Sequence, residues 1–133
     1  MSFVKILVCC HKETAYLEND IFKPILLGTN NADEKLLGFF DNNFKDNQGI
    51  NISDKHPYYA ELTSIYWAWK NYEQLGNPEY IGLFHYRRFF NFKGKINGND
   101  PWQYAFLNFN KSSQKDLAGM KELSKKFVKV LIL

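Results

Sequence analysis

The sequence predicts an α/β fold in which a mostly parallel sheet is flanked by helices. Residues 4–10 form a continuous apolar run, which is typical of a strand buried on both faces of a sheet. A polar loop, an apolar-striped helix over 58–75 and a second apolar run over 80–90 follow. This strand–helix–strand order is typical of parallel strands joined by right-handed crossovers.

The composition is that of one globular domain, taken as residues 1–133, with 45% apolar and 23% charged residues. The net charge is +3 and the basic residues are scattered, which disfavours nucleic-acid binding and leaves a basic RNA-binding module as a distant alternative. Cys9 and Cys10 are neighbours on a predicted strand, so we expect no disulfide between them. The sequence shows no signal peptide and no stretch of membrane-spanning length, so we expect a cytoplasmic protein.

The remaining elements are predicted from local patterns. No element is assigned over 16–35, where Pro24 and Gly28 interrupt the pattern, whereas 36–40 is predicted as a short strand and 41–53 as a polar loop. Trp67 is expected to pack against a strand or to line a cleft. The C-terminal part is predicted as a loop over 91–100, a helix over 116–126 and a strand over 127–133. The predicted core stripe of the helix over 58–75 is Leu62, Ile65, Tyr66, Trp69 and Tyr72.

The sharpest chemical feature is the pair Arg87 and Arg88 at the end of the second apolar run. A guanidinium buried without a partner costs several kcal/mol, so both must face a ligand, a carboxylate or solvent. Strand alternation places Arg87 on the face of His85 and Arg88 on the face of Tyr86. A forked guanidinium matches a diphosphate well, and two surface arginines paired with acidic side chains are the alternative.

Two other stretches are candidates for ligand binding. His11 and Lys12 end the first apolar run, which is where ligands bind in open α/β sheets. The stretch from Asn51 to Thr63 leads into the predicted helix, where free amides attract anions, although Ser and Asp there most often only cap the helix. The sequence has no Asp-x-Asp, no metal-type Cys/His spacing and no glycine-rich phosphate loop, so no metal ligand is assigned.

Two motifs resemble a bacterial family of domains of unknown function that occurs in capsular and exopolysaccharide gene clusters. They are Tyr59-x-Glu61-Leu62-Thr63-x-x-Tyr66-Trp67-Ala68-Trp69-Lys70-Asn71 and Tyr80-Ile81-Gly82-Leu83-x-His85-Tyr86-Arg87-Arg88. The resemblance covers residues 4–92 and includes 6–12 and 51–53. It implies a glycosyltransferase-like domain with a GT-A/Rossmann-like fold, of which this chain is the nucleotide-sugar half. Family members continue further, so we expect the C-terminal part to be missing and the chain alone to be poorly active.

The resemblance implies transfer of a sugar from a nucleotide sugar, expected to be a UDP-sugar, to a glycan or lipid-linked acceptor in capsular, exopolysaccharide or lipopolysaccharide biosynthesis. The candidate catalytic residues are His85, Arg87 and Arg88, whose charge would offset that of the diphosphate. The candidate substrate-binding residues are His11, Lys12, Asp41, Asn51, Tyr59, Glu61, Thr63, Trp67 and Tyr86.

Several partner questions stay open at this stage. The resemblance leaves Mg²⁺ or Mn²⁺ open as a cofactor, although the Asp-x-Asp motif is absent. Peripheral membrane association and a homodimer through an exposed C-terminal strand are further expectations, whereas nucleic acid is not expected. A non-catalytic nucleotide-sugar or carbohydrate-binding remnant is the alternative function.

Overall fold

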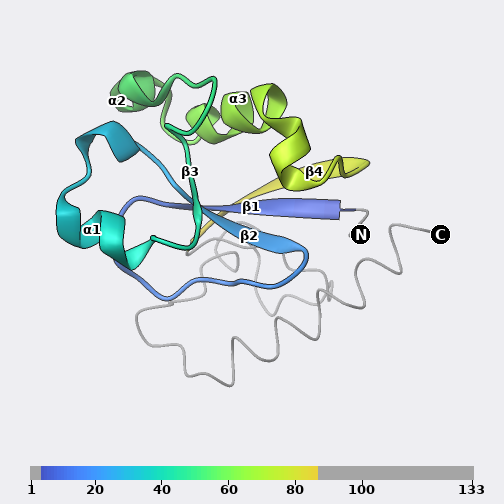
Figure 1. Ribbon diagram of the computed structural model, residues 1–133, viewed down its shortest axis with the longest axis horizontal. Coiled ribbons are helices and arrows are strands. Elements are labelled where there is room, and N and C mark those ends of the chain that lie inside the picture. The colour runs from blue at the N-terminus through green and yellow to red at the C-terminus, as the bar shows by residue number, and fades with distance from the viewer. Residues whose placement is uncertain (1–3, 87–133) are drawn as a thin grey trace, which may run out of the picture.

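The computed structural model describes residues 4–86, which form a four-stranded sheet flanked by helices (Figure 1). The strand order is β3-β2-β1-β4 and every neighbouring pair is parallel, which confirms the predicted α/β class. The strands are β1 (Val4–Cys10), β2 (Phe22–Leu26), β3 (Phe44–Lys45) and β4 (Tyr80–His85). The helices are α1 (Glu34–Phe39), α2 (His56–Tyr59) and α3 (Leu62–Lys70), and the 3₁₀ turns are η1 (Thr29–Asn31), η2 (Ser53–Lys55) and η3 (Tyr72–Leu75).

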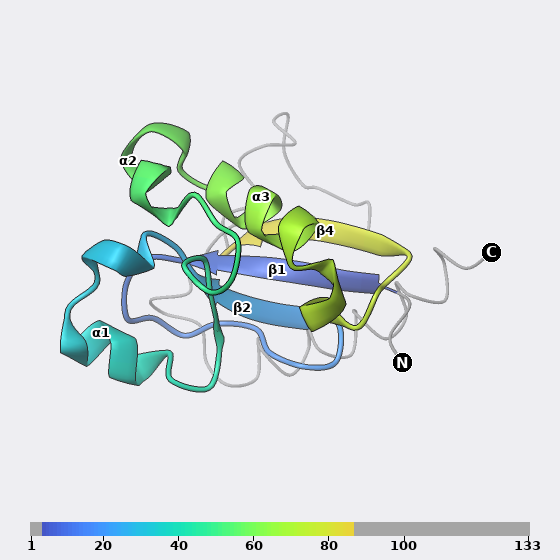
Figure 2. The same ribbon diagram turned by 45° about the horizontal axis from the view of Figure 1, so that its top comes forward.

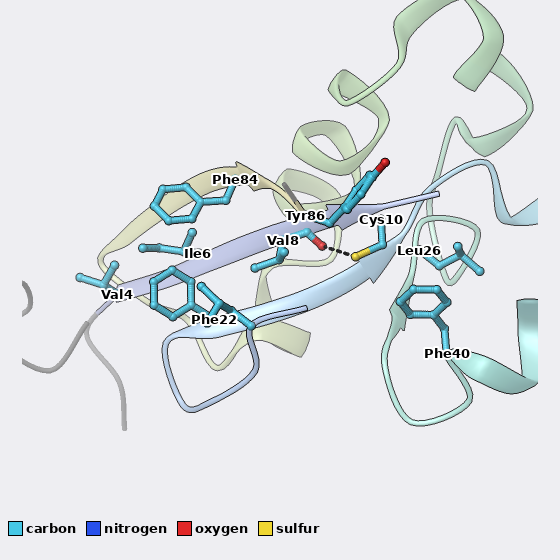
Figure 3. Close-up of a cluster of buried hydrophobic side chains, with 10 residues drawn as sticks. Val4, Ile6, Val8, Cys10, Phe22, Leu26, Phe40, Phe84 and Tyr86 are labelled. Carbon is cyan, nitrogen blue, oxygen red and sulfur yellow. Dashed lines mark hydrogen bonds between the residues drawn. The ribbon is translucent and has the colours of Figure 1, made fainter. Parts of the chain in front are cut away.

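The core is divided by the sheet into two layers, because alternate residues of β1 point to opposite faces. One layer contains Val8 and Cys10 with the large side chains Phe22, Phe40 and Phe84 (Figure 3). The other layer places Leu7, Cys9 and Ile25 under the Trp67 and Ala68 side chains of α3. Cys9 and Cys10 are therefore free, buried thiols in different layers, as the sequence predicts.

Strand β2 lies within the segment to which the sequence assigned no element. Its middle residue is Pro24, which has no amide hydrogen to give to a ladder. Ile21 and Leu27 make backbone bonds toward β1, and the Leu26 carbonyl accepts from Asp46 on the β3 side. By alternation Pro24 also faces the β3 side, where pairing begins only at Ile25. The proline therefore removes no ladder bond, and the strand tolerates it.

The predicted strand over 36–40 is wrong, because this stretch belongs to helix α1. The Asp33 side chain accepts a hydrogen bond from the Leu36 amide at 2.8 Å, which is an N-cap that a strand would not need. Leu36, Leu37 and Phe40 then recur at helical spacing and pack against one core layer. The apolar run is short, and the capping residue decides between helix and strand.

The single helix predicted over 58–75 is also wrong. It is broken at Ala60 and at Asn71 into α2, α3 and η3. The predicted stripe does not form the core, because Leu62, Ile65 and Trp69 are exposed. The face of α3 that packs on the sheet carries Thr63, Ser64, Trp67 and Ala68. Figure 2 shows α3 lying over one face of the sheet. Small side chains there permit close approach, including a contact of 3.3 Å between Ser64 Oγ and Cys9 Sγ.

Two further expectations change. The predicted polar loop over 41–53 contains β3 and ends where η2 begins. Of the predicted strand over 80–90, Tyr80–His85 form β4, whose first residues Tyr80 and Ile81 are exposed, and residues 87–90 lie outside the described residues. The predicted loop over 91–100, helix over 116–126 and strand over 127–133 lie outside the described residues.

Ala60 joins α2 to α3 in a conformation that favours glycine, with φ 46° and ψ −124°. We expect Ala60→Gly to stabilise the protein by about 0.5–1 kcal/mol, because relief of backbone strain exceeds the added chain entropy. Urea unfolding followed by circular dichroism measures the change. Ala68→Gly, in the regular part of α3, is the comparison and should destabilise by about 1 kcal/mol through the helix backbone, with a further loss because its methyl group is buried. Destabilisation by both substitutions would show that Ala60 is not strained.

Candidate functional site

The site lies where the carboxyl ends of β1 and β4 meet. From β1 the chain passes outward to β2 and β3, whereas β4 adds to the opposite side of β1. The order of the strands therefore reverses between β1 and β4. In open α/β sheets such a switch point, at the carboxyl ends of the strands, is where ligands bind.

Five side chains gather at this switch point, and we call them the His85 cluster: His11, Lys12, Glu61, His85 and Tyr86. The pairing of Cys9 with His85 and the bond from the Tyr86 amide to the Cys9 carbonyl, at 2.9 Å, bring the two strand ends together. The His11 ring lies 5.9 Å from the His85 ring and 5.3 Å from the Tyr86 ring, centroid to centroid. The Lys12 ammonium stands 5.7 Å from the Tyr86 ring centroid.

The cluster combines buried and solvent-facing groups. Tyr86 is only 2% exposed and lies beneath the other groups, whereas His11 and Lys12 are exposed. Glu61 Oε1 lies 3.7 Å from His85 Nε2, which is an ion-pair distance when the histidine is protonated. A cation, two imidazoles, a carboxylate and an aromatic ring beside one another can bind a phosphate-bearing ligand and exchange protons with it.

The position of Glu61 depends on a buried anchor that sequence reasoning missed, the Asp46 carboxylate. Asp46 is fully buried and accepts hydrogen bonds from four donors. They are the Gly28 amide (2.9 Å), the Thr29 amide (3.1 Å), the Ser53 hydroxyl (2.6 Å) and the Thr63 hydroxyl (2.9 Å). The anchor thus ties the turn after β2 to the start of α3, two residues from Glu61. The only sequence signal is that Asp46 is one of two aspartates in the Asn-rich loop over 41–53.

Three predicted substrate-binding residues make structural contacts within the protein and do not belong to the His85 cluster. Thr63 is fully buried on Asp46. Trp67 is fully buried beside Phe44, as predicted for packing, and its indole donates to the Gln48 carbonyl at 2.8 Å. The Asn51 amide donates to the carbonyls of Asn47 and Gly49, so it fixes its own loop.

The other predicted residues are spread more widely. Tyr59 is exposed at the end of α2, next to Ala60. Asp41 lines a polar cleft of about 400 Å³ at the β3 edge with Lys23, on the opposite side of the sheet from the cluster. Arg87 and Arg88 lie outside the described residues and directly follow Tyr86 in the sequence.

Two kinds of feature are absent from the described part of the chain. Residues 4–86 contain no group of three or more His, Cys, Asp or Glu side chains arranged to hold a metal ion. The helices within the same residues are all too short or too polar to cross a membrane.

The parallel sheet and the cluster at its switch point define an α/β domain of the GT-A/Rossmann-like class. The chain belongs to the family described as "Domain of unknown function (DUF4422)", whose model matches residues 5–133. Membership confirms the resemblance to a family of domains of unknown function, and the match extends beyond residues 4–92, where the resemblance was expected to end.

A solved structure gives the second comparison. The chain is similar to the apo structure of WbbM, which is described as a bifunctional glycosyltransferase, with 39% sequence identity and a TM-score of 0.61. The similarity covers 74% of this chain and 16% of the WbbM chain, so the present chain corresponds to a small part of that protein. No curated protein matches the chain.

Proposed function

We propose that this chain is the donor-binding part of a glycosyltransferase and that the His85 cluster binds the diphosphate of a nucleotide sugar. One observation carries the proposal: a histidine- and lysine-bearing cluster occupies the switch point of a sheet whose sequence is 39% identical to part of a bifunctional glycosyltransferase. We expect a UDP-sugar as donor and a glycan or lipid-linked acceptor.

The proposed chemistry assigns the cluster to the leaving group. In sugar transfer, an acceptor hydroxyl oxygen forms a bond to the anomeric carbon, and the bond from that carbon to the diphosphate oxygen breaks. The diphosphate keeps the electron pair and the hydroxyl proton passes to a base. Lys12 and His11 would stabilise the negative charge on the departing diphosphate. Arg87 and Arg88, which follow Tyr86 in the sequence, would contribute in the same way. Glu61 would orient His85 through their contact at 3.7 Å.

The cationic groups make the proposed diphosphate site independent of a divalent metal. We expect the 133-residue chain to bind UDP, and to bind it equally well with Mg²⁺, with Mn²⁺ or with a chelator. Isothermal titration calorimetry measures this directly. UMP should bind more weakly, because it lacks the second phosphate that the cations would contact.

The outcomes of these binding experiments, together with a turnover assay, distinguish the proposed function from its alternatives. Binding that requires a metal would contradict the charge-offset argument, and equal affinity for UMP and UDP would contradict a diphosphate site. Binding of free oligosaccharides without UDP would favour the carbohydrate-binding remnant. Release of free sugar or its transfer from a labelled UDP-sugar, followed in single-turnover assays, would show that the chain is catalytic by itself.

A further inference from the structure

A second cavity, away from the His85 cluster, is the polar cleft at the β3 edge. Its volume of about 400 Å³ falls within the range of small-molecule pockets, about 300–1,000 Å³. Its polar walls are formed by Glu18, Lys23, the stretch 41–43, Gln48 and Gln74. The cluster lies at the ends of β1 and β4, which are two and three strand positions from β3, at about 4.8 Å per position. The two sites are therefore separate.

The wall over 41–44 is fixed by hydrogen bonds within the protein. The Lys45 ammonium donates to three neighbouring carbonyls at distances from 3.0 to 3.4 Å. The buried Asn43 side chain accepts a hydrogen bond from the Tyr16 hydroxyl at 2.9 Å and donates one to Glu18 at 3.1 Å. Because these bonds already order the wall, a ligand does not have to order it, and the entropic cost of binding is smaller.

Other polar groups of the cleft are left to bind a ligand. Within residues 4–86, the side chains of Lys23, Asp41 and Asn42 make no hydrogen bond or ion pair. The Gln48 side-chain oxygen accepts from a backbone amide at 3.1 Å, which leaves its NH₂ group to donate elsewhere. Donors and acceptors therefore stand side by side in the cleft, and the half-buried Phe44 adds an apolar surface.

The balance of charge in the cleft selects the class of ligand. Of the described residues that line it, Glu18 and Asp41 are acidic and Lys23 alone is basic. A phosphate would meet more negative than positive charge, so the cleft does not suit the diphosphate of a nucleotide sugar. A sugar hydroxyl is neutral and both donates and accepts hydrogen bonds, so it matches adjoining carboxylates and amides.

We propose that the polar cleft binds a neutral sugar unit of a glycan, at a site separate from the donor site. Asp41 accepts hydrogen bonds from sugar hydroxyls, the NH₂ groups of Asn42 and Gln48 donate to them, and Phe44 contacts the apolar part of the sugar ring. That the neutral ligand is a glycan, and not another polyol, rests on the proposed glycosyltransferase function. A glycan held in the cleft stays close to the donor site, which raises its effective concentration there.

Nuclear magnetic resonance of the unaltered 133-residue chain tests the proposal, because side-chain NH₂ groups give signals of their own. The probes are the neutral methyl glycosides of glucose, galactose, mannose, rhamnose and N-acetylglucosamine. We expect at least one of them to shift the NH₂ signals of Asn42, Gln48 and Gln74 in a saturable way. No shift with any glycoside would overturn the proposal. Shifts with inorganic phosphate alone, or with spermidine alone, would also overturn it, because the cleft would then be a site for an anion or for a cation.

A substitution at Asp41 tests the contact with the sugar. Asp41→Ala should raise the Kd for the glycoside about tenfold, because a hydrogen bond to a charged group is lost. The variant should keep its fold, since the Asp41 side chain is exposed and makes no hydrogen bond within residues 4–86. Asp54→Ala, the matched control, removes an exposed carboxylate that does not line the cleft and should change this Kd less than about twofold. Equal affinity of both variants for the glycoside would overturn the assigned role of Asp41 and with it the site.

The glycan site and the donor site can fail separately in the same experiment. UDP should shift the backbone amide signals of His11 and Lys12 and leave the NH₂ signals of the cleft unchanged. UDP binding without glycoside binding would overturn the glycan site alone. Glycoside binding at the cleft of a chain that does not bind UDP would support the glycan site and overturn the donor proposal, in favour of the carbohydrate-binding remnant.

Discussion

Replacing Asp46 by asparagine should destabilise the protein by about 3 kcal/mol, since a buried donor left without an acceptor costs about 1–3 kcal/mol. Each Asp46 carboxylate oxygen accepts from two donors. An asparagine keeps one oxygen but turns an NH₂ group toward the other two donors. The hydroxyl of that pair can rotate and accept from the NH₂ group, whereas the backbone amide of the pair is left without an acceptor. Urea unfolding followed by tryptophan fluorescence measures the loss, because Trp67 is buried beside the same loop.

The control for this substitution is Asp54→Asn, which makes the same chemical change at an exposed position in η2. It should alter the free energy of unfolding by no more than about 0.5 kcal/mol. If Asp46→Asn changed the free energy of unfolding as little as the control does, the four hydrogen bonds would contribute little to stability. Asp46 would then not be the anchor that ties the turn after β2 to the start of α3.

Removing one arginine should weaken UDP binding by about 1.5–3 kcal/mol, which is roughly a 10- to 150-fold rise in Kd. The substitutions are Arg87→Ala and Arg88→Ala, and the physical reason is the loss of a charge-assisted contact to the diphosphate. From the sequence we expect one to matter far more than the other, because alternation along the predicted strand over 80–90 would place the two side chains on opposite faces. This prediction rests on the sequence, where both arginines directly follow Tyr86.

Calorimetry measures the affinity of both variants for UDP. The control is Lys23→Ala, which removes a cation from the polar cleft at the β3 edge, on the opposite side of the sheet from the cluster. The control should bind UDP as the parent chain does. If neither substitution lowered the affinity for UDP, the two arginines would have no part in diphosphate binding. Lys12 would then be the main cation of the proposed site.

Part of the candidate site could be predicted from the sequence because it depends on strand ends. His11 and Lys12 follow one apolar run, and His85 and Tyr86 close another. The carboxyl ends of parallel strands share one edge of a sheet, so a correct assignment of two strands brings these residues near one another. Their separations, such as 5.3 Å between the His11 and Tyr86 rings, follow from the register of β1 against β4.

The local sequence pattern could not show which of the other predicted site residues reach the His85 cluster. Thr63, Trp67 and Glu61 occupy the same sequence motif, yet Thr63 and Trp67 are buried supports and only Glu61 reaches His85. Which side of a helix faces the sheet depends on the angle at which it is held. Ala60 and the Asp46 anchor set that angle for α3, and neither has a pattern visible along the chain.

The sequence by itself determined the fold class, the first and last described strands and the separation of the two thiols, because each depends on an apolar run or on alternation along one strand. Tertiary structure alone decided that Pro24 lies within a strand, that α3 packs on the sheet with the face that carries Trp67 and Ala68, and that Trp69 faces outward. Each of these depends on which neighbour stands beside the element. A proline is harmless where no ladder forms, and an apolar stripe turns outward where hydrogen bonds hold the helix by its other face.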